Sequence, residues 1–386
     1  MLHPTTTSYS VIPPEVQGLI ASFVCRPDLR HCVRVCREWR EVFTPFFWRH
    51  VQRSDDQYDW GDQFLQSIRT GCLRKYSRHI RSIDIEGFDD ELEEILEHSP
   101  RTFPQLTSLR LLGLVKKDAL IADMIQRCSG GLQSFVCDLD DCDYGREYFG
   151  FGQKSAKAIL EHVSTLEVFR VEDPYLKSSQ IQQLLCTAPR LKEFNILTGD
   201  CDGWSQGLEA MDVVASDWVC KNLTVFGCHV RGIPRPDIVR TICGGPSSDY
   251  TLEGTIQESI NIQRQVYSQF ARLNCLRELR LGAPCNVDYM DYRERYQERD
   301  QQYDCLAMSL DSGLDLLGGL KHLRVVGLED MEMDIYRDKE AAWAKQHWPL
   351  AEILTTVFTL YEGDASEFDA SSDEFAIEDD YDDYSD

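Results

Sequence analysis

One short spacing constrains the fold of this chain more than any other feature. The pattern apolar-x-x-apolar-x-apolar begins at residues 80, 106, 132, 166, 191, 223, 276 and 320 of the 386-residue sequence. Its last two apolar positions are two residues apart, so they lie on the same face of a β-strand. The pattern predicts eight similar strands, at Ile80-Ile83-Ile85, Leu106-Leu109-Leu111, Leu132-Phe135-Cys137, Leu166-Phe169-Val171, Leu191-Phe194-Ile196, Leu223-Phe226-Cys228, Leu276-Leu279-Leu281 and Leu320-Leu323-Val325.

Helical patterns lie between these strands. Examples are "DDELEEILEHSP", "KSAKAILEHVS" and "SSQIQQLLCTAPR", and several end at Gly or Pro, which stop a helix. The copies start 26, 26, 34, 25, 32, 53 and 44 residues apart. Alternation of strand and helix at such a period is typical of a solenoid, whose strands line one concave surface that can bind a protein. An ordinary α/β domain with a chance spacing is the alternative.

The copies resemble leucine-rich repeats. The resemblance implies an α/β solenoid over residues 79–360, with parallel strands on the concave side and helices on the convex side. The family's Asn or Cys, three residues after the last apolar position, is missing here. Leu114, Asp140, Pro174, Arg231, Pro284 and Leu328 stand there instead. The repeats are therefore divergent, and their curvature and exact number do not follow from the sequence.

A small helical unit precedes the repeats. One apolar stripe begins after Pro13 and Pro14, and a second ends before Pro45. About 40 residues is the lower limit for independent folding, and a unit this rich in aromatic side chains leaves some of them exposed. These features predict a docking module. The first stripe is Val16, Leu19, Ile20 and Phe23, and the second is Leu29, Cys32, Val33, Cys36, Trp39, Val42 and Phe43.

This unit resembles the F-box. The resemblance rests on Ile12-Pro13-Pro14-Glu15, Leu29, Val35-Cys36-Arg37-Glu38-Trp39 and Trp48, although Ile12 replaces the more usual Leu. It implies binding to an acidic Skp-type adaptor and, through it, to a cullin scaffold. The adaptor-binding residues that it implies are Ile12, Pro13, Leu19, Leu29, Val35, Cys36 and Trp39. The alternative is a three-helix stub that packs on the next domain.

The distribution of charge separates the two parts of the chain. Residues 1–53 carry seven Arg and four acidic residues, a net charge of +3, whereas the whole chain carries -25 and the remainder therefore -28. This excess of negative charge argues against general affinity for nucleic acid, which requires a cationic surface. It also disfavours a third interpretation of the first helices, as a DNA-binding unit.

The sequence indicates an intracellular protein of the cytoplasm, the nucleus or both. It shows neither a signal-peptide pattern nor an apolar run long enough to cross a membrane. The fifteen cysteines include no CxxC pair, so we expect most of them to be small buried hydrophobes. We expect no cofactor and no metal, although His31, Cys32 and Cys36 lie close together in the sequence.

Two loops only partly match ligand-binding motifs. "GREYFGFGQKS", residues 145–155, has Phe151 where a phosphate-binding loop needs Lys. "CDLDDCDYG", residues 137–145, has Cys142 and Tyr144 where a calcium loop needs acidic side chains. We find no recognisable catalytic set and predict a protein that is not an enzyme.

Two further segments are strongly charged. Residues 286–305 are rich in Tyr and Arg, which suits either an interface or a solvated helix. Residues 361–386 carry twelve acidic residues and no Lys or Arg, so we expect a disordered tail. Ser366 and Ser371 each precede an acidic residue by three positions, a pattern that suits an acidophilic kinase.

Together these features predict the substrate-recognition subunit of an SCF-type, cullin-RING ubiquitin ligase. The predicted parts are the F-box at 10–53, a connector at 54–78, the repeats at 79–360 and the tail at 361–386. The repeat surface would bind the target protein, whose identity and recognition residues the sequence does not reveal. The alternative is an acidic repeat scaffold or histone-binding chaperone that uses the tail.

Overall fold

The structure is a computed structural model. It describes residues 12–52, 65–87, 89–113, 115, 117–138, 150–172, 174–196, 207–234, 255–282, 306–328 and 338–354. Residues 139–149, residues 286–305 and the tail from 361 lie outside this part, so the predictions made for them stay untested.

The chain begins with three short helices. They are α1 (Pro14–Phe23), α2 (Arg26–Val35) and α3 (Arg37–Phe47). Proline stands in the first turn of α1 and of α2, where its missing N–H costs nothing. Cys36 has an extended backbone between α2 and α3, and its sulfur accepts a hydrogen bond from Trp39 N (3.5 Å). The three helices enclose a core of their own around Ala21, Leu29 and Phe43.

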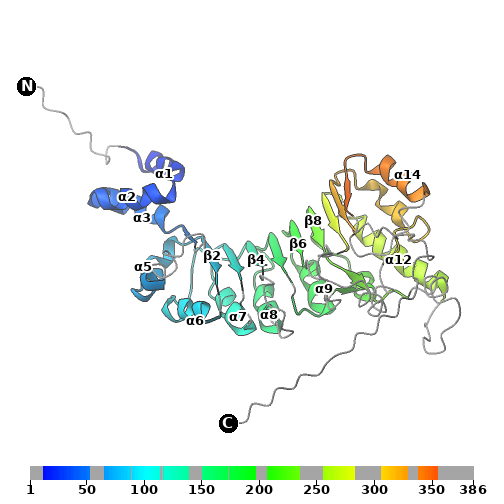
Figure 1. The fold of residues 1–386 in the computed structure, drawn as a ribbon, viewed down its shortest axis with the longest axis horizontal. Coiled ribbons are helices and arrows are strands. Elements are labelled where there is room, and N and C mark those ends of the chain that lie inside the picture. Colours follow the sequence, from blue (N-terminus) through cyan, green and yellow to red (C-terminus); the bar gives the residue numbers. More distant parts are fainter. Residues whose placement is uncertain are drawn as a thin grey trace, which may run out of the picture.

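A ten-stranded parallel sheet follows, and its strands lie side by side in chain order. Figure 1 shows these strands along the inner side of an arc, with the three N-terminal helices at one end and α14 at the other. The strands are β1 (His50–Gln52), β2 (Ser82–Glu86), β3 (Ser108–Leu112), β4 (Ser134–Asp138), β5 (Val168–Val171), β6 (Glu193–Asn195), β8 (Val225–Gly227), β10 (Glu278–Arg280), β11 (Val325–Gly327) and β12 (Glu352–Leu354). A separate two-stranded sheet pairs β7 (Leu208–Glu209) with β9 (Val230–Arg231).

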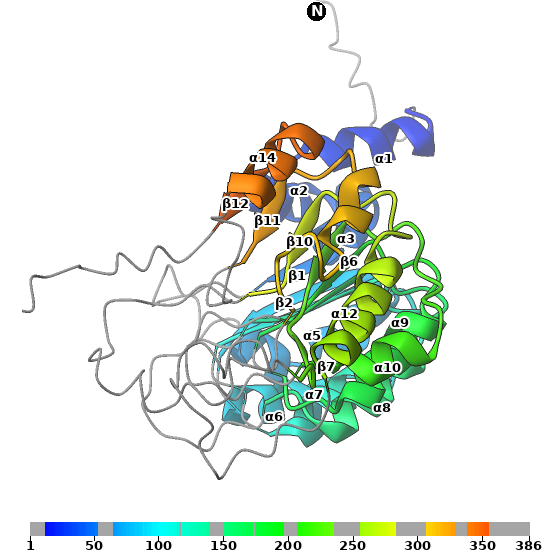
Figure 2. The same ribbon diagram turned by 90° about the vertical axis from the view of Figure 1, so that its right-hand side faces the viewer.

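Helices cover one face of the large sheet. Figure 2 looks along the arc and shows α7, α8, α10 and α12 together on that side. The helices after α3 are α5 (Cys72–Tyr76), α6 (Asp89–His98), α7 (Asp118–Gln126), α8 (Gln153–Leu160), α9 (Ser178–Thr187), α10 (Ala210–Ala215), α12 (Ile256–Phe270) and α14 (Asp338–His347), with the 3-10 helices η2 (Ser77–His79) and η4 (Leu314–Gly319). Residues 65–69 are also helical.

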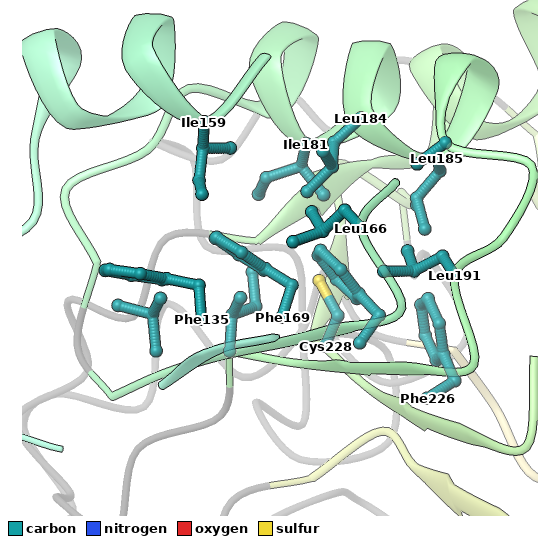
Figure 3. Packing of buried hydrophobic residues seen from close by; sticks show 14 of the residues in the cluster. Phe135, Ile159, Leu166, Phe169, Ile181, Leu184, Leu185, Leu191, Phe226 and Cys228 are labelled. Carbon is teal, nitrogen blue, oxygen red and sulfur yellow. The ribbon is translucent and has the colours of Figure 1, made fainter. Parts of the chain in front are cut away.

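The core lies between the sheet and these helices. Burial alternates along the longer strands, so that Ile83 and Ile85 of β2 are buried between partly exposed neighbours. Four phenylalanines at equivalent positions stack through the middle of the core: ring centroids are 6.1 Å apart for Phe135 and Phe169, 5.7 Å for Phe169 and Phe194, and 5.8 Å for Phe194 and Phe226. Figure 3 shows Leu166, Ile181, Leu184 and other aliphatic residues packed over this phenylalanine ladder.

Hydrogen bonds also join the starts of neighbouring helices. The Asp118 carboxylate at the start of α7 accepts from the backbone N–H groups of Gly152 (3.0 Å), Lys154 (2.8 Å) and Ser155 (2.9 Å), which begin α8. The carboxylate of Asp89 in α6 likewise accepts from Lys117 N (3.1 Å). One helix therefore satisfies N–H groups that the next helix leaves free.

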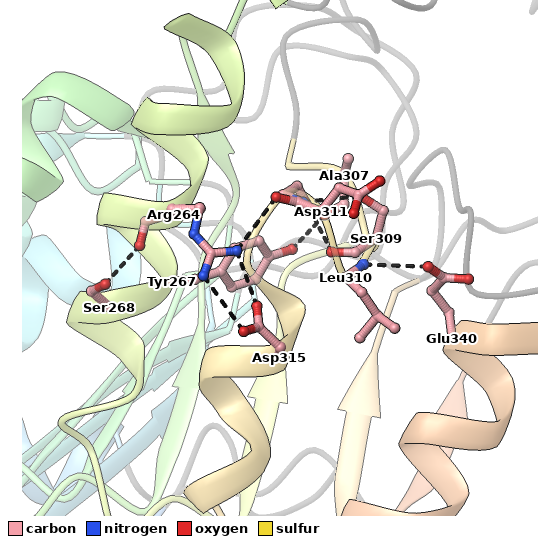
Figure 4. Close-up of polar contacts among 10 residues, drawn as sticks. Arg264, Tyr267, Ser268, Ala307, Ser309, Leu310, Asp311, Asp315 and Glu340 are labelled. Atoms are coloured by element: carbon pink, nitrogen blue, oxygen red, sulfur yellow. Dashed lines mark hydrogen bonds and ion pairs between the residues drawn. The ribbon is translucent and has the colours of Figure 1, made fainter. Parts of the chain in front are cut away.

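Polar contacts fix the C-terminal end of the arc (Figure 4). The Tyr267 hydroxyl of α12 donates to the carbonyl of Ala307 (2.7 Å), and the Arg264 guanidinium pairs with Asp315 of η4 (3.2 Å). The Glu340 carboxylate of α14 accepts from Leu310 N (3.3 Å). These contacts hold the last described strands in line with the earlier ones.

Seven of the eight predicted spacings coincide with strands of the one sheet, and β1 and β12 extend it at the two ends. The eighth prediction is wrong by three residues. Val326 of β11, and not Leu323, pairs with Leu279 of β10, and Val325 is only partly buried. The buried positions of this copy are Leu323, Val326 and Leu328, because the same apolar spacing recurs there.

The described chain is thus a helical N-terminal module followed by an α/β region with a large parallel sheet. Classification of that region as leucine-rich repeats stays a prediction. The expectation for the cysteines is wrong in part: of the ten described free cysteines only Cys128, Cys137, Cys220 and Cys228 are buried. The small N-terminal module leaves Cys25 and Cys36 exposed, because it has too little core to cover them.

Candidate adaptor-docking surface

The first helix presents an apolar face to solvent. Val16, Leu19, Ile20 and Phe23 of α1 are 43%, 59%, 38% and 82% exposed, and Val35 at the end of α2 is 62% exposed. Gln17 and Ala21, on the other side of α1, are buried. We call these five exposed residues the apolar face of the module. Half of the ten large apolar side chains that are strongly exposed in the described part of the chain lie in this short segment.

The structure distributes the predicted adaptor-binding residues between the surface and the interior. Leu19, Val35, Pro13 and Cys36 are exposed. Ile12 is half-buried, and its carbonyl accepts a hydrogen bond from the Gln17 side chain (2.7 Å).

Leu29 and Trp39 belong to the interior of the module. Leu29 is only 6% exposed, within the core of the three helices. Trp39 is half-buried, and its ring lies 5.3 Å from that of Phe43. In the free chain these two side chains hold the helices together.

Sequence reasoning did not assign Val16, Ile20 and Phe23 to the docking surface. They belong to the same helical stripe as Leu19, but the resemblance to the F-box implied only Leu19 of that stripe as an adaptor-binding residue. The signal that pointed to exposure was the size of the unit, because about 40 residues supply too few contacts to cover every apolar stripe.

Arginines occupy the second and third helices. Arg26, Arg30, Arg34, Arg37 and Arg40 are all exposed. Arg37 pairs with Glu41 (3.0 Å), and Arg40 donates to the carbonyl of Val33 (3.3 Å). Residues 12–52 contain six Arg and four acidic residues, so the module is cationic on a chain whose net charge is -25. Such a surface suits an acidic partner.

The module continues directly into the sheet. Strand β1 follows α3 and pairs with β2, with His50 opposite Ser82. The Trp48 ring stacks on Tyr76 of α5 at a centroid distance of 4.8 Å and packs against the main core, in which Val51 is buried. These contacts fix the orientation of the docking surface relative to the sheet.

The open face of the sheet is a second candidate surface. Arg110 of β3 lies between Asp84 of β2 (3.9 Å) and Asp138 of β4 (3.5 Å), and Arg170 of β5 pairs with Glu193 of β6 (2.5 Å). Burial raises the pKa of the Asp84 carboxyl; the Arg110 charge lowers it and the Asp138 charge raises it, and the net shift is upward. This face is polar and carries charges of both signs, with carboxylates close together.

The described part of the chain offers no metal-binding cluster and no membrane-spanning helix. Its residues include no group of three or more His, Cys, Asp or Glu side chains that could hold a metal ion. They likewise include no helix that is both long and apolar enough to cross a membrane. Burial raises the pKa of the Cys128 and Cys220 thiols to about 12, so these thiols are not reactive at neutral pH.

Comparison with known families decides the nature of the N-terminal module. Residues 9–54 match the family model described as F-box-like. The module is F-box-like. The match confirms the predicted N-terminal F-box and covers 46 of 386 residues. No curated protein matches the chain.

Proposed function

We propose that this protein is the substrate-recognition subunit of an SCF-type ubiquitin ligase. The F-box-like module would bind a Skp-type adaptor and, through it, a cullin. The observation that carries the proposal is the exposed apolar face of Val16, Leu19, Ile20, Phe23 and Val35, in the segment that matches the F-box-like family.

A partner that covers this apolar face would gain free energy from burying its side chains. Burial of a large apolar side chain that was exposed contributes roughly 1.5–3 kcal/mol. Phe23 and Leu19 are the most exposed members of α1, so they gain most from being covered. The neighbouring arginines would add electrostatic steering toward an acidic adaptor. Leu29 and Trp39 would act from inside the module by holding the helices in the binding-competent arrangement.

The sheet region would bind the target. In our proposal it is a divergent leucine-rich-repeat solenoid; its ten parallel strands in chain order and its helices on one face support this assignment. The protein would itself break and form no bonds. It would hold the target beside a ubiquitin-loaded enzyme, and the resulting proximity would accelerate transfer.

The test is calorimetric titration of the full chain with a purified Skp-type adaptor. Leu19→Glu places a charge on the apolar face, and we expect it to weaken binding by at least about 30-fold, as an interface hot spot of roughly 2 kcal/mol requires. Val35→Glu tests the same face from α2. Both side chains are more than half exposed, so neither change disturbs the core.

Met211→Glu is the matched control. Met211 of α10 is 61% exposed, almost the same as Leu19 at 59%, but lies outside the F-box-like segment. We expect this variant to bind the adaptor as the wild type does. Equal affinity of the wild type, Leu19→Glu and Met211→Glu would show that the apolar face is not the docking site.

A further inference from the structure

Four cationic or titratable side chains gather where the F-box-like module joins the sheet. Arg49 and His50 lie at the start of β1, Arg81 immediately precedes β2, and Arg26 begins α2. We call these four residues the junction cluster. It lies at the edge of the sheet, and none of its members belongs to the apolar face of the module.

Backbone pairing and side-chain contacts bring the cluster together. The carbonyl of Arg49 accepts from the N–H groups of both Arg81 (2.9 Å) and Ser82 (3.1 Å), so the residues that begin the two strands are neighbours. The Arg26 guanidinium reaches from α2 to the carbonyl of Gln52 (3.3 Å) and lies 6.0 Å from the ring centre of Phe47. His50 Nδ1 is 2.8 Å from the Ser82 hydroxyl.

The charges of three arginines act on the His50 imidazole. Burial lowers the pKa of His50, and the charges of Arg49, Arg26 and Arg81 lower it further. Coulombic effects of this kind decline with distance. The charges of Arg49, Arg26 and Arg81 thus all reach the His50 imidazole, in line with the backbone contacts that place these residues at one corner of the sheet.

The cluster has no carboxylate partner within the described residues. Several arginines elsewhere in the chain form ion pairs: Arg127 with Asp123, Arg170 with Glu193, Arg231 with Glu209 and Arg264 with Asp315. Neither Arg26, Arg49 nor Arg81 forms such an ion pair in the described structure, and the buried Nε of Arg49 has no hydrogen-bond partner. An unpaired buried donor carries a desolvation cost that a bound acceptor removes.

We propose that the junction cluster binds a phosphate monoester group. Three guanidinium groups offer more donors than one carboxylate accepts, whereas a phosphate dianion has three acceptor oxygens and a charge near -2. The side chains of the exposed residues Arg26 and Arg81 would contact two of these oxygens, and the half-buried Arg49 side chain would turn outward to donate to the third. Phosphoserine or phosphothreonine on a protein and free phosphate share this chemistry.

The surrounding charge makes the site selective. The chain carries a net charge of -25, which repels extended polyanions. Screening at physiological salt limits this repulsion to roughly 8 Å, so a single phosphate group beside three arginines is attracted locally. A phosphorylated peptide therefore suits the cluster better than a nucleic acid does.

The test follows the ring resonance of His50 in the full chain during titration with inorganic phosphate and, separately, with a phosphoserine peptide at constant ionic strength. We expect saturable binding, with an increase in the pKa of His50 because the anion offsets the arginine charges. Arg81→Ala removes an exposed side chain, and we expect it to weaken binding about tenfold, as loss of a charge-assisted hydrogen bond requires. Arg81→Lys keeps the charge, and we expect a smaller loss.

Arg277→Ala is the matched control, because Arg277 is an exposed arginine that immediately precedes β10 at the other end of the sheet. It should bind phosphate as the wild type does, and so should Leu19→Glu, because the apolar face is separate from the cluster. Tighter binding of the peptide than of phosphate would identify a protein-borne group, and equal binding would identify free phosphate. Three results would overturn the proposal. The His50 resonance could show no saturable change, or Arg81→Ala and Arg277→Ala could lose the same affinity for phosphate. The third is tighter binding of an RNA oligonucleotide than of the phosphopeptide.

Discussion

At the scale of single residues, Asp118 shows how one helix positions the next. Burial raises the pKa of its carboxyl, but hydrogen bonds from Ser155, Lys154 and Gly152 outweigh this effect, so the pKa lies below its usual value. The ionised carboxylate thus replaces water for three N–H groups at the start of α8. A Cβ added to Gly152 would lie 3.0 Å from this carboxylate, so any larger residue would push the carboxylate away from the N–H groups that it accepts from.

Asp118→Ala is expected to lower the free energy of unfolding by about 2 kcal/mol, because it leaves those N–H groups without their acceptor. Asp90→Asn is the control, since Asp90 is an exposed aspartate in the first turn of α6. Denaturant unfolding of the full chain measures both. The contribution of Asp118 is present above the unfolded pKa of about 3.9 and is lost as pH falls through the lower folded pKa. A loss no larger than that of Asp90→Asn would show that the capping contact is unimportant.

His162 makes the stability depend on pH in a different range. Its Nδ1 accepts from Leu132 N (3.3 Å), its Nε2 lies 3.3 Å from the carbonyl of Ile125, and burial lowers its pKa. A histidine with a lowered folded pKa stabilises the fold above the unfolded pKa of about 6.5, and this contribution declines as pH falls below that value.

We expect His162→Gln to be less stable than the wild type at pH 7. The difference between them should narrow as pH falls from 6.5 to 5, by at most about 1.4 kcal/mol per pH unit. Thermal unfolding of both proteins across this range measures the difference. A constant difference would mean that His162 is protonated equally in the folded and unfolded states.

At the scale of elements, the sequence spacing predicted the strands because burial of Leu109 and Leu111, or of Phe135 and Cys137, leaves a two-residue period. The spacing did not predict the two outermost strands, β1 and β12. At β12 Ile353 pairs with Val326 and takes the second position of the pattern, with Leu350 at the first, but the third position is a polar residue, Thr355. At β1 only Trp48 and Val51 fit, because the third position is a charged residue, Arg53.

Stacked phenylalanines join neighbouring strands of the sheet, whereas the Asn or Cys side chains typical of leucine-rich repeats are missing. The phenylalanine ladder passes through β4, β5, β6 and β8 with nearly parallel rings, at interplanar angles of 24°, 17° and 28°. Such offset pairs add to the free energy of apolar burial. No spacing rule in the sequence indicated stacking, because it depends on the register between strands.

Phe194→Ala is expected to cost about 3–5 kcal/mol of unfolding free energy, because it leaves a cavity between two rings. Phe194→Leu fills most of that volume, and we expect it to cost less than about 1.5 kcal/mol. Denaturant unfolding of both variants measures this difference. Nearly equal costs would indicate that the neighbouring strands close around the gap.

The sequence predicted the candidate docking surface only in part, because the exposure of its side chains depends on how the helices pack. The F-box pattern located the segment, but a pattern does not distinguish side chains that face a partner from those that face the module's own core. Leu29 is buried and Phe23 is 82% exposed, although both lie on apolar helical stripes. That difference depends on how three short helices pack, which arises only in the folded module.

At the scale of the whole molecule, the F-box-like module and the sheet are joined without a free hinge at α3 and β1. Trp48 stacks on Tyr76, and β1 supplies the first strand of the sheet. An adaptor bound at the module would therefore hold the sheet at a fixed orientation. For a protein that acts by positioning its target, this rigidity is the mechanical requirement.

The most direct test of the central claim is hydrogen exchange of the full chain, measured with and without a Skp-type adaptor. We predict that the adaptor slows exchange in α1, α2 and α3, and leaves the strands from β3 to β12 unchanged. Leu19→Glu should abolish this protection, and Met211→Glu should retain it. Protection confined to the sheet, or no adaptor-dependent change in the three helices, would contradict the account.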